Sequence, residues 1–196
     1  ESSKLLIDEY ANSFSKNQNI KKESVKRNER ISVIEKEIES WIKYSIESLN
    51  ALGEYAKPLN INVIVENHGG LSSNASLLMK VINQVNLENC GTLPDFGNFC
   101  MSGEYGSLKD DNCEDPYDPY LGVSEMLPRA FGLSAKSYEF DSNGDETTLN
   151  YYKLLSIAKD AGYSGYIGVE YEGEKLSEID GIIATKKLLE KAASKI

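Results

Sequence analysis

Apolar residues recur at intervals of three and four from residue 31 onward, a pattern that predicts an amphipathic helix. We expect this stripe to form packing surface and the helix to close at Pro58 and Asn60; its members are Ile31, Ile34, Ile38, Trp41, Ile42, Ile46 and Leu49. Residues 1–30 are polar and basic with few apolar anchors. The sequence therefore predicts a polar N-terminal lead-in over 1–30, whose structure the pattern does not specify, and one folded domain over 31–196.

Beyond residue 60, short runs of β-forming residues alternate with helical patterns. Strands are expected at 61–66, 91–96, 130–140 and 165–173, helices near 73–86, 146–161 and 177–195, and a long loop over 97–124. Ser72 or Ser73 is the expected N-cap of the first of these helices. Strands that alternate with helices predict right-handed crossovers and a parallel sheet, so the expected fold class is α/β.

Polar side chains follow each expected strand. The first strand ends in Glu66, with the single histidine, His68, two residues further on; the later strand ends carry Asp95, Ser134 with Lys136, and Glu170 with Glu172. In a parallel α/β barrel the carboxyl ends of all strands lie on one face, where acidic strand ends converge. A hard divalent cation makes such a gathering of carboxylates favourable. The alternative is that these residues meet solvent at the rim of the sheet.

Composition excludes some partners. The net charge of −10 argues against nucleic acid, because phosphate binding needs a basic surface. No apolar run approaches the length of a membrane span, so we expect no membrane partner. The start shows no signal-peptide pattern, and the sequence leaves open whether the location is cytoplasmic or exported, that is, periplasmic. The three cysteines lack C-x-x-C spacing. Cys100 and Cys113 bracket a polar loop, and the sequence leaves their redox state open.

Four ordered motifs resemble the sugar phosphate isomerase/epimerase family, which has the xylose-isomerase-like TIM barrel. They are ENHGG at 66–70, DFGNF at 95–99, SAKSYEFD at 134–141 and GYIGVEYEG at 165–173. The resemblance implies a divalent metal, Mn, Mg, Co or Zn, held by Glu, Asp, His and Glu. Carried over by position, the three carboxylates are Glu66, Asp95 and Glu170, and the histidine position falls on Ser134.

Serine is a poor replacement for an imidazole, so the resemblance leaves the fourth ligand to His68 or to water. Asn98 falls where relatives often place a polar substrate-binding group; otherwise it is a turn residue. Lys136, on the same strand face as Ser134, is a candidate contact to a sugar oxygen or phosphate, and Glu172 is a further candidate contact.

A complete barrel of this kind has eight (β/α) units and about 250 residues. This chain shows four, which resemble the C-terminal half. We expect the inner strand faces, with Val63 or Ile64, Leu133, and Ile167 or Val169, to be covered by a missing N-terminal half or by self-association.

The implied activity is metal-dependent proton transfer next to the carbonyl of a sugar or sugar phosphate, through an enediolate. Glu66 and Glu170 are the expected acid/base pair, and the 97–124 loop is expected over the metal side, tethered by Cys100–Cys113. One alternative is a non-catalytic or remnant carbohydrate-binding half-barrel. Another is an endonuclease-IV-like metal hydrolase, but such enzymes use several histidines and a basic groove.

Overall fold

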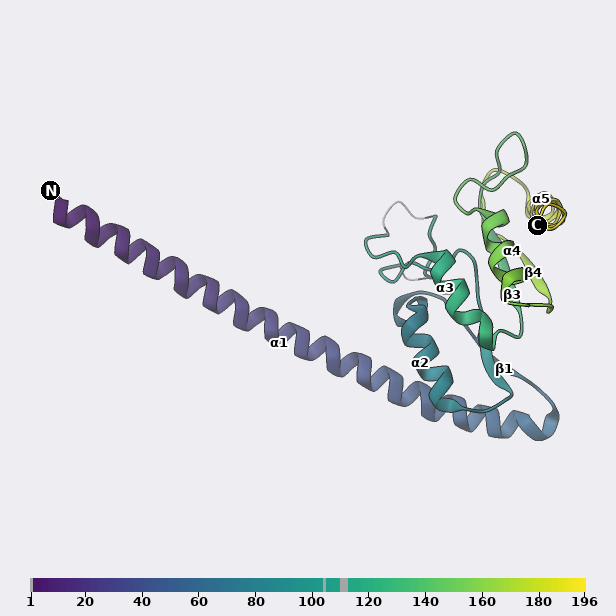
Figure 1. Ribbon diagram of the computed structural model, residues 1–196, viewed down its shortest axis with the longest axis horizontal. Coiled ribbons are helices and arrows are strands. Elements are labelled where there is room, and N and C mark those ends of the chain that lie inside the picture. Colours follow the sequence, from purple (N-terminus) through teal and green to yellow (C-terminus); the bar gives the residue numbers. More distant parts are fainter. Residues whose placement is uncertain (1, 104, 110–112) are drawn as a thin grey trace. The chain divides into compact units, whose positions relative to one another are not determined.

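The computed structural model describes residues 2–103, 105–109 and 113–196, with the backbone alone for residues 2–22 and 24. The chain divides into two compact units, Glu1–Lys43 and Tyr44–Ile196. Helix α1 (Ser2–Ala56) runs from the first into the second (Figure 1). Residues 2–30 of the expected lead-in thus belong to a helix, and the change of composition near residue 30 does not mark the start of an element.

The apolar stripe of α1 is packing surface over only part of its predicted length. Ile42 and Leu49 are buried and Trp41 is half-buried, but Ile31 and Ile34 are 43% and 54% exposed. The expectation that these two residues pack was therefore wrong. The helix closes as predicted, with a 3₁₀ turn, η1 (Lys57–Leu59), and Asn60 in the left-handed conformation.

Four parallel strands lie within the described residues and form two two-stranded sheets, which confirms the α/β fold class. They are β1 (Val63–Glu66), β2 (Cys90–Leu93), β3 (Leu133–Ser137) and β4 (Ile167–Tyr171), paired β1 with β2 and β3 with β4. Parallel bridges from Thr92 to Ala130 and from Asp95 to Ser134 join β2 to β3. Each strand is shorter than predicted; β2 ends before Pro94, which has no N–H to donate.

One expectation about the first part of this unit was wrong. Helix α2 (Ala75–Val85) is capped by Asn74, whose side chain accepts from the Leu77 N–H at 3.0 Å, and not by Ser72 or Ser73. Both serines belong instead to the 3₁₀ turn η2 (Gly70–Ser73), where their hydroxyls accept the N–H groups of His68 and Gly69, which follow β1.

Two further boundaries differ later in the chain. The expected 97–124 loop contains a helix, α3 (Pro119–Met126), which starts at the Asp118 N-cap and is followed by η3 (Leu127–Arg129). Helix α4 (Tyr151–Asp160) begins five residues later than expected because the carboxylate of Glu146 binds backbone N–H groups of the preceding turn, including that of Thr148 at 2.6 Å. The final helix, α5 (Glu178–Ala193), starts close to the predicted position near residue 177, and Ser177 is its N-cap.

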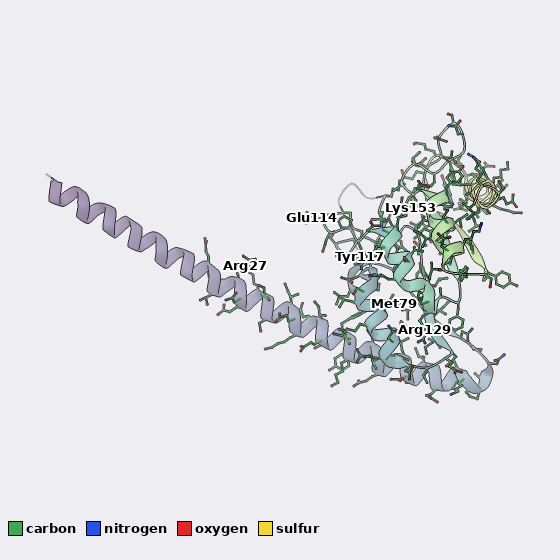
Figure 2. All side chains as sticks on the ribbon, viewed as in Figure 1. Arg27, Met79, Glu114, Tyr117, Arg129 and Lys153 are labelled. Carbon is green, nitrogen blue, oxygen red and sulfur yellow. A yellow bond between two sulfur atoms is a disulfide. The ribbon has the colours of Figure 1, made fainter. Side chains whose placement is uncertain are left out.

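Helices α2, α3, α4 and α5 pack in succession and bury the core of the second unit. Their buried residues include Leu78, Ile82, Leu154 and Leu188. Arg129, labelled in Figure 2, donates from one guanidinium nitrogen to the carbonyls of Leu87 and Cys90 and so fixes the start of β2. Within the part of the chain that the structure describes, no helix is both long and apolar enough to cross a membrane.

One side of the sheet, which we call the site face, carries the polar strand ends. By strand alternation and register its residues are Ile64, Glu66, Leu93, Asp95, Ser134, Lys136 and Glu170. The predicted inner-face positions Leu133, Ile167 and Val169 alternate with these residues, so that prediction was wrong and they face the helices. Ile64 does lie on the site face and is 40% exposed.

Candidate functional site

Three carboxylates from different strands meet at the carboxyl end of the sheet. Glu66 ends β1, Asp95 follows β2, and Glu170 lies in β4. One oxygen of each lies within 4.8 Å of the others. Asp95 is buried, whereas Glu66 and Glu170 are half-buried, so the cluster is open on one side. The strand ends thus bring together the three acidic residues singled out from the sequence.

Asp95 is held rigidly from its backbone and from one carboxylate oxygen. Its N–H donates to Asn67 Oδ1 at 2.8 Å, and its Oδ1 accepts from the Gly97 N–H at 2.9 Å. Its Oδ2 is buried and has no hydrogen-bond partner among the described residues. A buried carboxylate oxygen without a donor is costly, so this atom is available to a cation or to a hydrogen-bond donor.

Asn98 extends the cluster toward Glu66. Its side-chain N–H₂ donates to Glu66 Oε1 at 3.2 Å, and its own Oδ1 is a second buried oxygen without a partner in the described structure. Its backbone carbonyl accepts from Asn67 and from the Ser73 hydroxyl. Asn98 is therefore a built part of the site and not merely a turn residue.

Ser134 and Lys136 both bind Glu170. The Ser134 hydroxyl donates to Glu170 Oε2 at 2.6 Å, and Lys136 Nζ lies 3.1 Å from Glu170 Oε1. The same ammonium lies 2.9 Å from Glu172 Oε1, and the Lys136 side chain is only 1% exposed. The two residues therefore fix the orientation of Glu170, and Lys136 is a buried ammonium inside an acidic cluster.

Burial and neighbouring charge push the pKa values of these groups in different directions. Burial and the Glu170 charge raise the pKa of Glu66, and burial raises the pKa of Asp95 well above its usual value. Burial also acts to raise the pKa of Glu170, but the Ser134 hydrogen bond and the Lys136 charge outweigh it and lower that pKa. Burial acts to lower the pKa of Lys136, but Asp95 and the two glutamates raise it.

His68 does not join the carboxylate cluster. Its ring lies edge-on to Tyr105 at a centroid distance of 5.9 Å, and it is not among the described residues whose ligand atoms meet.

Asn67 was missing from the site residues predicted from the sequence. This residue is fully buried and holds Asp95 by two hydrogen bonds. Its position directly after the strand end, beside Glu66, was the available signal.

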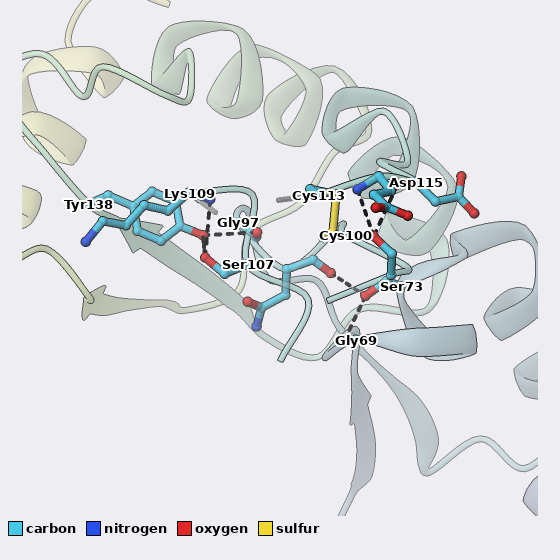
Figure 3. The surroundings of a disulfide bond; sticks show 12 residues. Gly69, Ser73, Gly97, Cys100, Ser107, Lys109, Cys113, Asp115 and Tyr138 are labelled. Atoms are coloured by element: carbon cyan, nitrogen blue, oxygen red, sulfur yellow. Dashed lines mark hydrogen bonds between the residues drawn. A yellow bond between two sulfur atoms is a disulfide. The ribbon is translucent and has the colours of Figure 1, made fainter. Parts of the chain in front are cut away.

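The described residues of a disulfide-closed loop contact segments that follow the strands (Figure 3). Cys100 and Cys113 are bonded, which confirms the expected tether, and Cys90 is a buried free thiol. The Ser107 hydroxyl donates to Tyr138 Oη, and Tyr138 in turn donates to the Gly97 carbonyl, both at 3.1 Å. These contacts bind the loop to the residue that follows β3.

The same loop also contacts the segment after β1. Gly106 has a φ of +77°, and a Cβ there would lie 2.4 Å from the Gly69 nitrogen, so only glycine permits this approach. On the other side, Lys109 forms an ion pair with Glu174, beyond β4, at 3.4 Å. The loop is thus attached around the site at three strand ends.

The donor set fits a hard divalent cation. Its three carboxylates supply oxygen ligands, the Asp95 Oδ2 atom lacks a donor, and the Ser134 hydroxyl is a fourth oxygen at the cluster. Glu66 and Glu170 come from the first and last described strands and lie on either side of Asp95 in the strand order. The arrangement can bind a cation and exchange protons with a ligand.

Comparisons with known proteins place these units in a family. A family model described as xylose isomerase-like TIM barrel matches residues 26–193. The chain is 33% identical over 66 residues to the C-glycoside deglycosidase alpha subunit of Arthrobacter globiformis, a match that covers 32% of this chain and 19% of that protein.

Two solved structures share the fold. A D-tagatose 3-epimerase-like protein has a TM-score of 0.58 at 16% identity, over 79% of this chain and 55% of that chain. A D-psicose 3-epimerase from Clostridium cellulolyticum H10, solved with D-tagatose, has a TM-score of 0.52 at 11% identity, over 79% of this chain and 54% of that chain. The chain spans about half the length of these structures. The chain belongs to the xylose isomerase-like TIM barrel family. The four parallel (β/α) units of its described residues form part of such a barrel.

Proposed function

We propose that this chain forms the metal-binding part of the active site of a sugar or sugar-phosphate isomerase or epimerase. The observation that carries the proposal is the convergence of Glu66, Asp95 and Glu170 around the donor-less Oδ2 of Asp95. The family and the epimerase fold of its structural neighbours support the same class of reaction. The ligand is a small molecule, because the net charge of −10 opposes a nucleic-acid phosphate backbone.

Glu66, Asp95 and Glu170 would hold the cation. Their all-oxygen donor set favours Mg²⁺ or Mn²⁺ over Zn²⁺ or Co²⁺, which bind imidazole and thiolate more readily. A divalent cation bound there supplies polarisation of the substrate carbonyl and stabilisation of the enediolate charge.

The two glutamates divide the proton transfer between them. One removes the proton from the carbon next to the carbonyl, and the other delivers a proton to the opposite face or to the neighbouring carbon. Ser134 and Lys136 hold Glu170 in place, while Asn98 orients Glu66 through its 3.2 Å hydrogen bond. The buried Lys136 is engaged with carboxylates, so it acts on Glu170 and does not receive a substrate phosphate.

Solvent deuterium exchange tests this proposal across a panel of sugars. The chain is incubated with Mn²⁺ in D₂O with D-tagatose, D-psicose, D-fructose or their phosphates, and NMR follows the carbon next to the carbonyl. We expect deuterium to appear there in at least one sugar. Glu66→Gln and Glu170→Gln should each slow the exchange by about 10³-fold, because general acid–base catalysis contributes on that order.

Glu190→Gln provides the matched control, since Glu190 is an exposed glutamate on α5 and pairs only with Lys186 among the contacts described. Its exchange rate should equal that of the unsubstituted chain. Absence of exchange in every sugar, with Mn²⁺ bound, would reject the enzymatic proposal.

A second candidate is a carbohydrate-binding half-barrel without catalysis. Two observations favour it: a serine, Ser134, stands at the histidine position of the resembling family, and the chain spans about half of the solved structures. Calorimetric sugar binding without deuterium exchange is the result expected for this alternative. An endonuclease-IV-like hydrolase is disfavoured, because the one histidine, His68, lies outside the described carboxylate cluster.

A further inference from the structure

We infer that Lys136 is a charge-balancing residue that sets the preference of the carboxylate site for divalent over trivalent cations. The inference rests on the proposed metal site and goes beyond it, because it assigns cation selectivity to a residue that is not a ligand. It starts from the position of one ammonium group, which lies within 3.1 Å of a proposed ligand and is nearly inaccessible to solvent.

Lys136 cannot move its charge away from the site without disrupting the fold. It occupies the fourth position of the fully buried strand β3, in register with Glu170. The Gly97 backbone packs against its aliphatic stem so closely that a Cβ at Gly97 would lie 2.9 Å from Lys136 Cδ. Its Nζ is further held by Glu172 Oε1 at 2.9 Å. The ammonium is therefore a fixed part of the site.

The fixed ammonium changes the charge that a cation meets. With the three carboxylates ionised, as a bound cation requires, Glu66, Asp95, Glu170 and Lys136 together carry two negative charges. A divalent cation neutralises that charge, whereas a trivalent cation leaves an excess positive charge beside the ammonium. Glu172 also pairs with the ammonium, at 2.9 Å, but it is not among the described carboxylates whose oxygens meet, so its charge lies farther from a cation bound by the other three.

A merely structural role for Lys136 makes a different prediction. If Lys136 only orients Glu170, its loss would weaken the binding of all cations by a similar factor. If the Lys136 charge sets selectivity, removal of that charge changes the ratio of trivalent to divalent affinity, even where both affinities also fall. The ratio is therefore the decisive readout.

Ca²⁺ and Tb³⁺ are suitable probes, because both prefer oxygen ligands and they have nearly the same radius but different charge. Tb³⁺ binding is followed by its luminescence, and Ca²⁺ binding by competition against Tb³⁺. The variants are Lys136→Met and Lys136→Gln, which remove the charge, and Lys136→Arg, which keeps it. Lys159→Met removes the same charge at the end of α4, from an exposed residue outside the site, and serves as the control.

We expect the Tb³⁺-to-Ca²⁺ affinity ratio to rise at least about fivefold in Lys136→Met and Lys136→Gln. Both variants remove the repulsion between the ammonium and the bound cation, and that repulsion is larger for the trivalent ion. The ratio should stay within about twofold of the original in Lys136→Arg and Lys159→Met. Circular dichroism identifies a variant that fails to fold. In that case the affinity ratios of the other neutral variant and of Lys136→Arg test the inference.

Each outcome separates this inference from the proposed function. An unchanged ratio in a folded neutral variant, or an equal rise in Lys136→Arg, would overturn the selectivity role and leave the metal site intact. Failure of the unsubstituted chain to bind either ion would overturn the metal site and the inference with it.

Discussion

At the scale of single residues, Ser134 is the position that separates this chain from the metal-binding pattern it resembles. An imidazole there would be a ligand, whereas the serine hydroxyl donates to Glu170 Oε2 at 2.6 Å and so acts mainly on another residue. The site keeps its three carboxylates but relies on oxygen alone. This explains why we assign it to a hard cation.

Restoring the imidazole should change both affinity and metal preference. Ser134→His should bind Zn²⁺ at least about tenfold more tightly than the unsubstituted chain, because an imidazole nitrogen suits Zn²⁺ better than a hydroxyl. Isothermal titration calorimetry with Zn²⁺ and Mn²⁺ measures the effect. Ser134→Ala is the control, since it removes the hydroxyl without adding a ligand; a similar gain in that variant would contradict the explanation.

Asp145 provides a test of acid stability away from the site. Its carboxylate accepts from Lys191 Nζ at 2.7 Å and from the Tyr152 hydroxyl at 2.8 Å, and these bonds lower its pKa. A folded-state pKa below the unfolded value contributes stability above about pH 4 that is lost as the pH falls through the folded-state value.

Asp145→Asn should therefore lower the melting temperature at pH 7 and have progressively less effect as the solution is acidified. Thermal unfolding followed by circular dichroism from pH 7 downward measures the difference. Asp160→Asn, at an exposed position on α4, is the control and should show little change at any pH. A constant deficit across the whole pH range would show that Asp145 acts through packing and not through its charge.

The sequence was informative for residues whose role depends on their place along a strand. Glu66, Asp95 and Glu170 were found because each follows an apolar run, and strand ends in a parallel sheet meet. Asn67 was missed because its role depends on the Asp95–Asn98 backbone, about 30 residues away in the chain. The partners of Lys136 were not predictable for the same reason.

At the scale of elements, local chemistry explains both the successes and the errors. The start of the final helix was predicted to within one residue, and the end of α1 was located by the stop at Pro58 and Asn60. Helix α3 was missed even though Asp118 before Pro119 is a helix-start pattern, because the many polar and glycine residues of the loop dominated the interpretation. The start of α4 was misplaced because Glu146 binds backbone N–H groups that a helix would otherwise use.

The disulfide loop gives the clearest prediction at this scale. Cys100 and Cys113 are 13 residues apart, and breaking a bridge that closes a loop of this size costs about 3 kcal/mol. Cys100→Ser with Cys113→Ser should lower the free energy of unfolding by about that amount, measured by urea denaturation. Thiol counting of the unsubstituted chain, denatured without reductant, should give one free thiol, Cys90.

Three free thiols per chain would refute the bridge. Cys90→Ser separates the effect of the bridge from that of a buried cysteine, since it leaves the disulfide intact and should not loosen the loop. Limited proteolysis between Gly97 and Tyr117 should accelerate only in the double variant.

At the scale of the whole molecule, the second unit presents an incompletely covered sheet. The site face carries Ile64, which is 40% exposed, and Phe131, whose ring lies against Gly91, is also 40% exposed. Helices α2 to α5 cover the helix-facing side, so only the site face needs a packing partner. The sequence overestimated the apolar area of this face, because Leu133, Ile167 and Val169 point to the helices.

We therefore predict that this chain associates with a second copy or with another half-barrel across the site face. Sedimentation at micromolar concentration should show a dimer or larger species, because exposed apolar side chains and sheet edges are stabilised by pairing. Ile64→Lys places a charge on this face and should shift the chain toward monomer, whereas Ile179→Lys, at an exposed position on α5, should not. A cooperative monomer with no partner would contradict this prediction.

The central claim is that Glu66, Asp95 and Glu170 form one divalent-metal site, and Mn²⁺ binding measured by electron paramagnetic resonance tests it most directly. We predict one Mn²⁺ per chain for the unsubstituted protein and binding weakened at least about a hundredfold in Asp95→Asn and Glu66→Gln, since each loses a charged ligand. Glu190→Gln should bind Mn²⁺ unchanged. No Mn²⁺ binding by the unsubstituted chain, or unaltered binding in Asp95→Asn, would contradict the claim.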